Sequence, residues 1–182
     1  MNVAIKRPKS RALAAIAPLL QYPRADYAAR AAECKGMIEL FYPAAGKCMA
    51  EFCAAIADKP LTELEELYTR TFDMAPLCTP YITTYLYGEE NFERGALMTQ
   101  LAERYAQSNF DLNGELPDHI AVILEFAPHF SPEELSELIE YCLSSPLEKM
   151  CTTLKDAGSM YYFLMKTALA ILPGEQLEDC QK

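Results

Sequence analysis

The sequence predicts an all-α fold, and three observations support this prediction. The 182-residue chain contains 25 Ala and 23 Leu but only 9 Ile and 2 Val, so residues that favour helices far outnumber β-branched aliphatic residues. Patterns typical of helix starts recur along the chain, and apolar residues follow them at spacings of three and four. Hydrophobic residues make up 51% of the chain, enough for one core at this length. We therefore expect a single helical domain over residues 1–182, a bundle of about eight helices.

The first third of the chain predicts three helices. Ser10 and Asp26 can cap the first two through their side-chain oxygens, and Pro43 fits the first turn of the third. The first helix ends at Tyr22-Pro23, because a residue that precedes proline disfavours helical backbone. The expected ranges are about 10–20, 27–40 and 43–57.

The middle of the chain predicts amphipathic helices separated by irregular segments. Thr62 and Glu65 form a capping-box pattern before an apolar stripe. Asn91 can cap a later helix, and Pro117 fits the first turn of the helix after that. We expect helices over about 62–72, 92–107 and 117–127, with irregular segments over about 73–88 and 108–114.

The last third of the chain predicts two helices, each begun by a capping box. Ser131 with Glu134 starts the first, and Ser145 with Glu148 starts the second. Apolar residues of the second helix keep helical spacing as far as a Pro-Gly stop signal. The expected ranges are about 131–143 and 145–172, followed by a short C-terminal tail over 173–182.

The charge of the chain is strongly negative and unevenly distributed. The net charge of −10 disfavours binding to nucleic acid or to an anionic membrane surface. Residues 1–35 hold 7 basic and 2 acidic side chains, which leaves −15 for residues 36–182. This acidic body can attract a basic partner, or it can serve only to keep the protein in solution.

The N-terminus carries basic residues before an apolar run, an order shared with targeting leaders. Pro18 interrupts the run, and the small-residue cleavage pattern at Ala15–Ala17 would place that proline directly after the cut. We therefore interpret residues 1–9 as a basic tail. No other segment reaches the roughly 18 apolar residues of a membrane span, so we expect no stable membrane insertion and a location in the cytoplasm.

The cysteines and histidines argue against metal and catalytic sites. The seven cysteines form no C-x-x-C pair, so we expect reduced thiols that pack as small apolar side chains. His119 and His129 stand ten residues apart and lack the spacing of a zinc site. Neither a G-x-S-x-G elbow nor a phosphate-binding glycine loop occurs. We expect no enzyme, no metal and no tightly bound cofactor.

The densest polar cluster, E-L-P-D-H, covers residues 115–119, directly before an apolar stretch. If the helix begins at Pro117, a rotation of about 100° per residue places Asp118 on the same face as Glu125, opposite the apolar stripe. The cluster has two interpretations. The acidic residues can simply favour the positive end of the helix dipole, or a carboxylate and an imidazole can anchor a cationic peptide.

Five short motifs stand in an order and spacing that together are specific. They are L-L-Q-Y-P at 19–23, Y-T-R-T-F-D at 68–73, Y-G-E-E at 87–90, Arg94-Gly95, and E-L-P-D-H-I-A-V-I-L-E-F at 115–126. The ordered set resembles the NarJ/TorD/DmsD family of molybdoenzyme maturation chaperones. The resemblance spans roughly residues 12–170, nearly the whole chain.

The resemblance implies an all-helical cytoplasmic chaperone dedicated to one molybdoenzyme. Such a chaperone binds the apo form of the catalytic subunit, shields its N-terminal leader, often of the twin-arginine type, and holds the subunit for cofactor insertion. Molybdenum cofactor would be met only transiently, through the client. The L-E-F after P-D-H indicates the nitrate-reductase branch of the family.

The resemblance also implies a peptide-binding surface. It assigns Tyr68, Phe72, Asp118 and His119 as peptide contacts, with Glu115 and Pro117 shaping the helix start. We expect the aromatic pair to grip the apolar part of a leader, and Asp118 with His119 its basic part. Core packing is the alternative role for the aromatic pair. Two other functions stay open: a general holdase for unfolded chains, and an enzyme that acts through Asp118 and His119.

Overall fold

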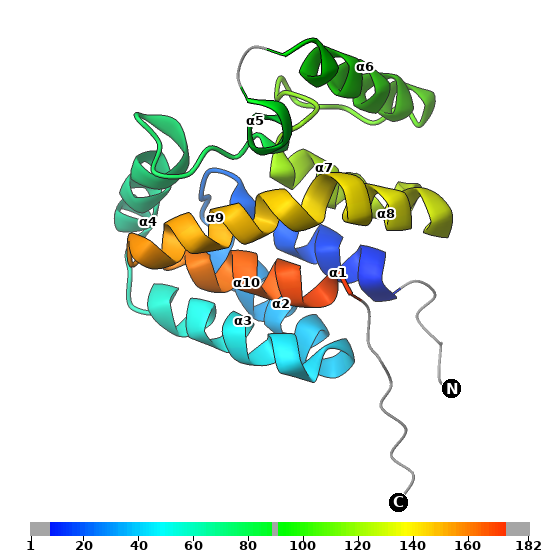
Figure 1. Ribbon diagram of the computed structural model, residues 1–182. Coiled ribbons are helices and arrows are strands. Elements are labelled where there is room, and N and C mark those ends of the chain that lie inside the picture. Colours follow the sequence, from blue (N-terminus) through cyan, green and yellow to red (C-terminus); the bar gives the residue numbers. More distant parts are fainter. Residues whose placement is uncertain (1–7, 89–90, 174–182) are drawn as a thin grey trace, which may run out of the picture.

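The computed structural model describes residues 8–88 and 91–173 (Figure 1), and its regular elements there are all helical. The all-α prediction is confirmed. The expected tails lie outside the described residues except Pro8 and Lys9, which belong to the first helix, and Pro173. The α-helices are α1 Pro8–Ile16, α2 Tyr27–Phe41, α3 Pro43–Ile56, α4 Leu61–Tyr68, α5 Ile82–Tyr87, α6 Phe92–Gln107, α7 Ile120–Phe126, α8 Pro132–Leu138, α9 Ser144–Asp156 and α10 Tyr161–Ile171. The 3₁₀-helices η1 Ala17–Leu20 and η3 Ala127–His129 and the π-helical turns η2 Thr69–Asp73 and η4 Ile139–Leu143 extend them.

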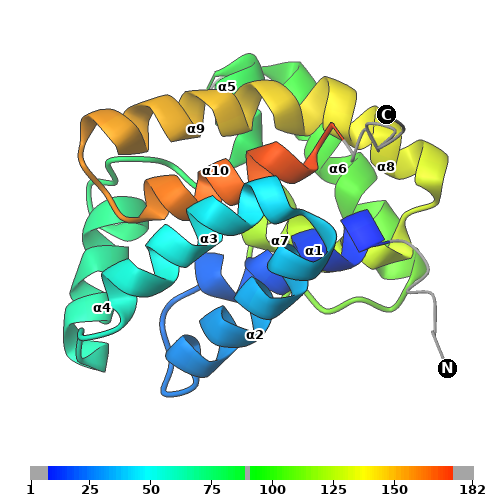
Figure 2. The same cartoon turned by 90° about the horizontal axis from the view of Figure 1, so that it is seen from below.

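The body of the molecule is a set of helices packed around α1 and α7 (Figure 2). Helix α3 packs against α2 and α10, and α10 packs back against α9. Helix α1 contacts α2, α7 and α10, and its side chains Leu13 and Ile16 are fully buried. A helix with so many helical neighbours places its apolar stripe in the centre of the core.

Helix α7 is buried on almost every side. Its side chains from Ile120 to Phe126 are buried, with the exception of Glu125. A helix that is apolar all round is stable only inside a protein. The start of α7 is therefore enclosed by neighbouring chain, and that enclosure determines where the polar residues before it point.

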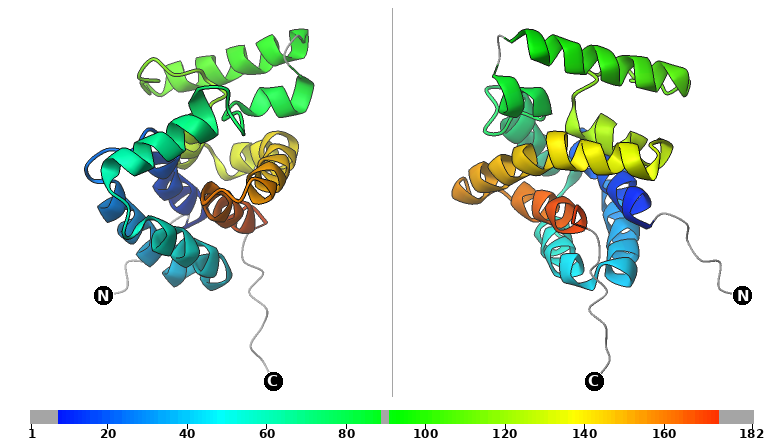
Figure 3. Two further views of the ribbon diagram at one scale, coloured as in Figure 1. Left: turned by 90° about the vertical axis from the view of Figure 1, so that its left-hand side faces the viewer. Right: turned by 45° about the vertical axis from the view of Figure 1, so that its right-hand side comes forward.

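Helix α6 forms an outer layer above the body (Figure 3). It packs on α5, and it is anchored near its C-terminal end, where Leu101 and Tyr105 are buried. Phe92, at its N-terminal end, is 92% exposed. The C-terminal half of α6 therefore holds this layer to the body, and it leads directly into the segment 108–119.

Two predicted helix caps are confirmed. The Ser131 hydroxyl accepts a hydrogen bond from the Glu134 amide (3.1 Å), and the Glu134 carboxylate accepts one from the Ser131 amide (2.6 Å), which completes a capping box. Asn91 accepts from the amide of Glu93 at 2.8 Å. Pro43 also opens α3 as predicted. These patterns succeed because all their partners lie within one turn.

Four predicted caps are wrong. Helix α4 begins at Leu61, so Thr62 already lies within its first turn. Helix α9 continues directly from the π-helical turn η4, which leaves no free helix start for Ser145 to cap. The Asp26 carboxylate caps no amide and instead accepts from Nε of Arg30 at 2.6 Å. Ser10 lies inside α1, which already includes Pro8.

The long C-terminal helix predicted over 145–172 is two helices. Helix α9 ends at Asp156 and α10 begins at Tyr161. Between them Gly158 has φ +63°, and the Gly158 amide donates to the Lys155 carbonyl at 3.0 Å. A residue in the left-handed region ends a helix, and glycine takes that conformation without strain. The chain therefore reverses here, and α10 returns along α9.

We predict that Gly158→Ala lowers the free energy of unfolding by about 1 kcal/mol, because its positive φ disfavours a Cβ atom. No atom lies within 4 Å of the added Cβ, so the cost comes from the backbone alone. Gly36→Ala is the matched control. Gly36 lies inside α2 with equally open surroundings, so alanine there should raise stability by about 0.5–1 kcal/mol. Urea unfolding measures the free energy of unfolding of both variants. Equal changes in the two would contradict the role assigned to the positive φ of Gly158.

Candidate functional site

A pocket of about 370 Å³ opens where the end of η1, the end of α4 and the start of α7 meet. Its lining residues come from 21–24, 110–115 and 119–125, together with Tyr68, and we call it the Tyr68 pocket. Three of the six predicted site residues line it, namely Tyr68, Glu115 and His119. Segments nearly a hundred residues apart in sequence therefore form one concave surface.

Tyr68 forms the aromatic wall of the pocket. Its ring meets the ring of Tyr22 edge-on, with centroids 5.6 Å apart, and its hydroxyl donates to the Leu20 carbonyl at 3.5 Å. Burial, and then the nearby Glu115 carboxylate, raise the pKa of Tyr68 to about 12. The phenol is therefore neutral at physiological pH and offers an apolar face with a polar edge.

Phe72 lies behind this wall. It is buried, and its ring centroid is 5.3 Å from that of Tyr68 and 4.8 Å from that of Tyr161. Phe72 does not line the Tyr68 pocket. The alternative role of core packing fits its position, and its contact with Tyr68 supports the wall from inside.

The Glu115 carboxylate lines the pocket and is held in place by two hydrogen bonds. Its Oε1 accepts from the Tyr81 hydroxyl at 3.2 Å and from the Leu116 amide at 2.9 Å. Burial, followed by Glu115, raises the pKa of Tyr81 to about 12, so this phenol keeps its proton and can donate. The second oxygen of Glu115 has no hydrogen-bond donor within the described part of the chain and can accept from a ligand.

The pocket carries more negative than positive charge. Asp111, Glu115 and Glu125 contribute carboxylates, and Arg24 is the one Lys or Arg among the described lining residues. Oε2 of Glu125 accepts from Nε2 of Gln21 at 3.2 Å. Acidic groups around an aromatic wall favour a cationic ligand with apolar parts.

His119 caps α7 with its side chain. Nδ1 accepts from the Ala121 amide at 3.1 Å, and the ring meets that of Tyr81 edge-on at 5.5 Å between centroids. Burial lowers the pKa of His119, although Glu115 and Asp118 act in the opposite direction. A ring nitrogen that accepts a hydrogen bond carries no proton. The imidazole is therefore neutral and shapes the pocket rather than adding charge.

Asp118 lies outside the pocket and is fully buried. The Thr83 hydroxyl donates to its Oδ2 and in turn accepts from Nε of Arg94 at 2.9 Å. Among the described residues, Oδ1 of Asp118 has no hydrogen-bond partner. The Asp118 carboxylate thus ties the start of α7 to α5.

The prediction that Asp118 shares an exposed face with Glu125 is wrong. Helix α7 begins at Ile120, so Pro117 lies before the helix rather than in its first turn. The backbone around Asp118 pairs instead with the segment before α5. The Ile82 amide donates to the Asp118 carbonyl at 3.0 Å, and the Ile120 amide donates to the Pro80 carbonyl at 2.8 Å. This pairing turns the Asp118 side chain inward.

Ten of the thirteen lining residues were not identified from the sequence as site residues, among them Gln21, Tyr22, Arg24 and Glu125. The sequence indicates Tyr22 only as a helix end and as part of the L-L-Q-Y-P motif, yet the residue is 49% exposed and its ring lies beside that of Tyr68. An aromatic residue directly before a proline, where a helix must stop, was the signal available. The packing that brings Tyr22 to Tyr68 has no local signature.

The described residues offer no metal cluster: nowhere do three His, Cys, Asp or Glu side chains group so as to hold an ion. The described cysteines are free thiols, and Cys180 lies outside that part of the chain. Burial raises the pKa of Cys34 to about 12 and that of Cys78 to about 11. Over 8–88 and 91–173, no helix combines the length and apolar character needed to span a bilayer.

Residues 39–159 match the family described as "Nitrate reductase delta subunit". The chain belongs to the nitrate reductase delta subunit family. A relative from Bacillus subtilis (strain 168), named "Probable nitrate reductase molybdenum cofactor assembly chaperone NarJ", is 30% identical over 160 residues, covering 87% of this chain and 86% of its own. The nitrate reductase-like protein NarX of Mycobacterium tuberculosis (strain H37Rv) is 31% identical over 79% of this chain, which spans 21% of NarX.

The fold also matches that of a solved structure. A crystal structure of an Archaeoglobus fulgidus protein assigned to redox enzyme maturation matches with a TM-score of 0.65, covering 95% of this chain and 99% of that one at 19% identity. Members of the family are non-catalytic assembly factors. The hypothesis of an enzyme acting through Asp118 and His119 has no geometric support, because Asp118 is buried away from the pocket.

We predict that Asp118→Ala lowers the free energy of unfolding by about 1–3 kcal/mol, because it leaves the buried Thr83 hydroxyl without its acceptor. Asp58→Ala, which removes an exposed carboxylate after α3, is the control and should change stability by less than about 0.5 kcal/mol. Chemical denaturation measures both variants. Equal stability of the two would show that the Asp118 contact contributes nothing.

We predict that the His119 cap makes stability depend on pH. The folded pKa lies below the ordinary value of 6.5, so the unfolded chain binds the proton more readily. The stabilisation is complete above that value and declines as pH falls through 6.5 toward the folded pKa. Asparagine caps helices without titrating, so His119→Asn should remove this part of the decline. Thermal melts of both proteins from pH 7.5 downward test it, and parallel curves would contradict it.

Proposed function

We propose that this chain is a NarJ-like maturation chaperone whose Tyr68 pocket binds the N-terminal leader of an apo-molybdoenzyme catalytic subunit. Family membership supports the maturation role. The observation that carries the leader role is the Tyr68 pocket itself, in which an aromatic wall faces three carboxylates. A leader that joins basic residues to an apolar segment complements both features.

The predicted site residues divide into two kinds under this proposal. Tyr68, Glu115 and His119 line the pocket and would contact the peptide. Glu115, held by Tyr81 but open on one oxygen, would accept from a leader guanidinium or ammonium group. Phe72, Pro117 and Asp118 would act from behind by holding these side chains, in place of the direct contact expected of Phe72 and Asp118.

The client and the compartment follow from the same proposal. The catalytic subunit would be bound before cofactor insertion, in the cytoplasm, where its leader is still unoccupied by the export machinery. Molybdenum cofactor would reach this chain only through the client, and no described group of ligand side chains argues for a resident metal. The relative from Bacillus subtilis carries nitrate reductase in its name, so a nitrate reductase subunit is the first client to test.

We predict that Tyr68→Ala and Glu115→Gln each weaken leader binding about 5- to 100-fold, the cost of an aromatic anchor or a charge-assisted hydrogen bond. The probe is a synthetic peptide with two adjacent arginines before an apolar stretch. Isothermal titration gives the affinity, and thermal melts show that the fold is kept. Phe72→Ala should mainly lower stability, by about 3–5 kcal/mol, because the ring is buried.

Two controls make this test specific. Glu51→Gln removes an exposed carboxylate on α3, a helix that contributes no residue to the pocket lining, and should leave affinity unchanged. A peptide with glutamines in place of the arginines should bind more weakly, and high salt should weaken the arginine peptide further. Equal binding of both peptides and of unrelated unfolded chains would contradict the proposal and would favour a general holdase.

A further inference from the structure

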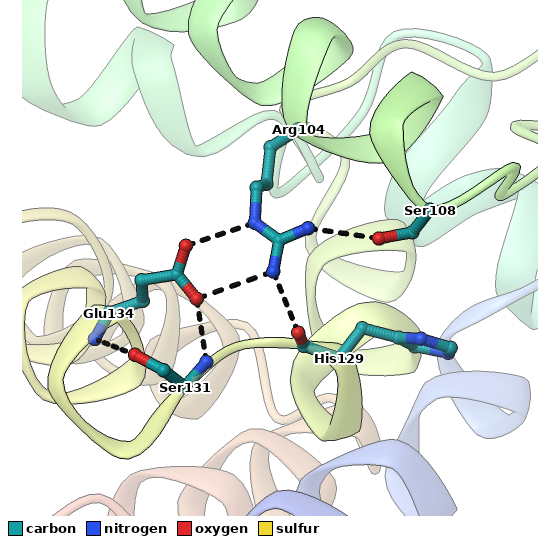
Figure 4. Close-up of polar contacts among 5 residues, drawn as sticks. All are labelled: Arg104, Ser108, His129, Ser131 and Glu134. Atoms are coloured by element: carbon teal, nitrogen blue, oxygen red, sulfur yellow. Dashed lines mark hydrogen bonds and ion pairs between the residues drawn. The ribbon is translucent and has the colours of Figure 1, made fainter.

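Arg104, near the C-terminal end of α6, forms hydrogen bonds with three residues (Figure 4). Its Nε and Nη2 donate to the two carboxylate oxygens of Glu134, at 3.0 and 3.3 Å. Nη2 also donates to the His129 carbonyl at 2.8 Å, and Nη1 donates to the Ser108 hydroxyl at 2.9 Å. The guanidinium therefore joins the end of α6 to the corner between η3 and α8.

The partners of Arg104 are themselves firmly placed. Glu134 completes the capping box of α8 with Ser131, and hydrogen bonds from Arg104 and then from the Ser131 amide lower its pKa. The guanidinium carbon also lies over the rings of Phe126 and Phe130, at 5.4 and 5.8 Å from their centroids. A planar guanidinium can satisfy a carboxylate, a carbonyl and a ring at once.

The segment 110–115, which follows α6, forms a second wall of the Tyr68 pocket, opposite in kind to the aromatic wall because it has no regular secondary structure; we call this segment "the wall". Residues 110–115 have no regular secondary structure, so side chains behind them determine where they lie. The ring of Phe110 packs on Tyr105, Phe126 and His129, with centroids 5.7, 5.1 and 6.1 Å apart. Phe126 is the same ring that Arg104 covers. The wall thus rests on the aromatic cluster that Arg104 fixes.

The far end of the wall is held from the same turn of α6. The hydroxyl of Tyr105, the next residue after Arg104, donates to the Pro117 carbonyl at 3.0 Å. The position of this turn therefore sets both ends of the segment that carries Asp111 and Glu115. If the turn shifts, the carboxylates move relative to Tyr68, which belongs to α4.

We infer that Arg104 is a positioning residue for the Tyr68 pocket. It fixes the segment 110–115, and it thereby sets the spacing between the carboxylates of Asp111 and Glu115 and the Tyr68 ring. The ligand part of this inference rests on the proposed function, whereas the placement of the wall does not. A wall held in place before binding reduces the ordering cost of taking up a peptide. The sequence motifs singled out no role for Arg104.

The test is Arg104→Lys, which keeps the charge but cannot make the forked contacts. We expect amide hydrogen exchange of residues 109–116 to quicken by about tenfold, with exchange in α2 and α3 unchanged. The amides of Phe110 and Glu115 report this directly, because each donates to a backbone carbonyl at 3.0 Å. Affinity for the arginine leader peptide should fall about 5- to 20-fold per folded molecule.

Arg30→Lys is the matched control, since Arg30 forms an ion pair with Asp26 on the surface of α2. It should change neither readout. Glu134→Gln weakens the same ion pair by removing the charge of the acceptor. It should shift the exchange rate and the peptide affinity in the same direction as Arg104→Lys, and it replaces that variant in the test if Arg104→Lys folds poorly. Unchanged exchange at 109–116, or faster exchange with full peptide affinity, would overturn the inference.

The two hypotheses fail in different ways. If the wild-type protein does not bind the leader peptide, the proposed function fails, and the exchange measurement alone then decides the role of Arg104. Faster exchange confined to residues 109–116 would support the placement of the wall by Arg104. Faster exchange throughout the protein, or unchanged exchange at residues 109–116, would overturn this role of Arg104.

Discussion

The burial of α7 is the constraint on which the rest of the structure depends. Glu125 is the one exposed residue of this helix, and its other side chains are buried against neighbouring parts of the chain or at the base of the Tyr68 pocket. A buried helix start cannot leave its amides to water, and protein groups must satisfy them. The His119 side chain and the Pro80 carbonyl do so, and this pairing fixes the segment before α7 against α5. The Tyr68 pocket forms where that fixed segment meets the surface.

The same constraint separates the polar residues before α7 by role. Asp118 faces inward and binds Thr83, whereas Glu115 faces outward and is steadied by Tyr81. A buried carboxylate with one oxygen lacking a partner in the described part of the chain is costly, so its value must lie in the junction it holds. The Glu115 carboxylate is only partly buried and keeps a spare acceptor, so it costs little and is available to a ligand. Two acids only three residues apart thus perform different tasks.

Two parts of the Tyr68 pocket are held in place in different ways: its floor by the packing of a buried helix, and the segment 110–115 by the side chains behind it. The floor is the buried start of α7, and the wall is an irregular segment whose order comes from Phe110 and the aromatic cluster beneath Arg104. Regular hydrogen bonding does not hold such a wall, so its position can respond to the outer helix α6. A surface of this kind can change shape without reorganising the core, because only the outer layer takes part.

The sequence by itself determined the all-α class, most helix positions and the caps at Asn91 and Ser131, because these depend on contacts within one or two turns. Through the family resemblance it also brought attention to Tyr68, Glu115 and His119, which do share a pocket. Only the tertiary structure decided that α7 begins at Ile120, that Asp118 points inward and that Tyr22 stands beside Tyr68. Asp118 meets Thr83 across 35 residues of chain, and Gln21 meets Glu125 across 104. Local periodicity carries no information about contacts at that separation, which arise only when the helices pack.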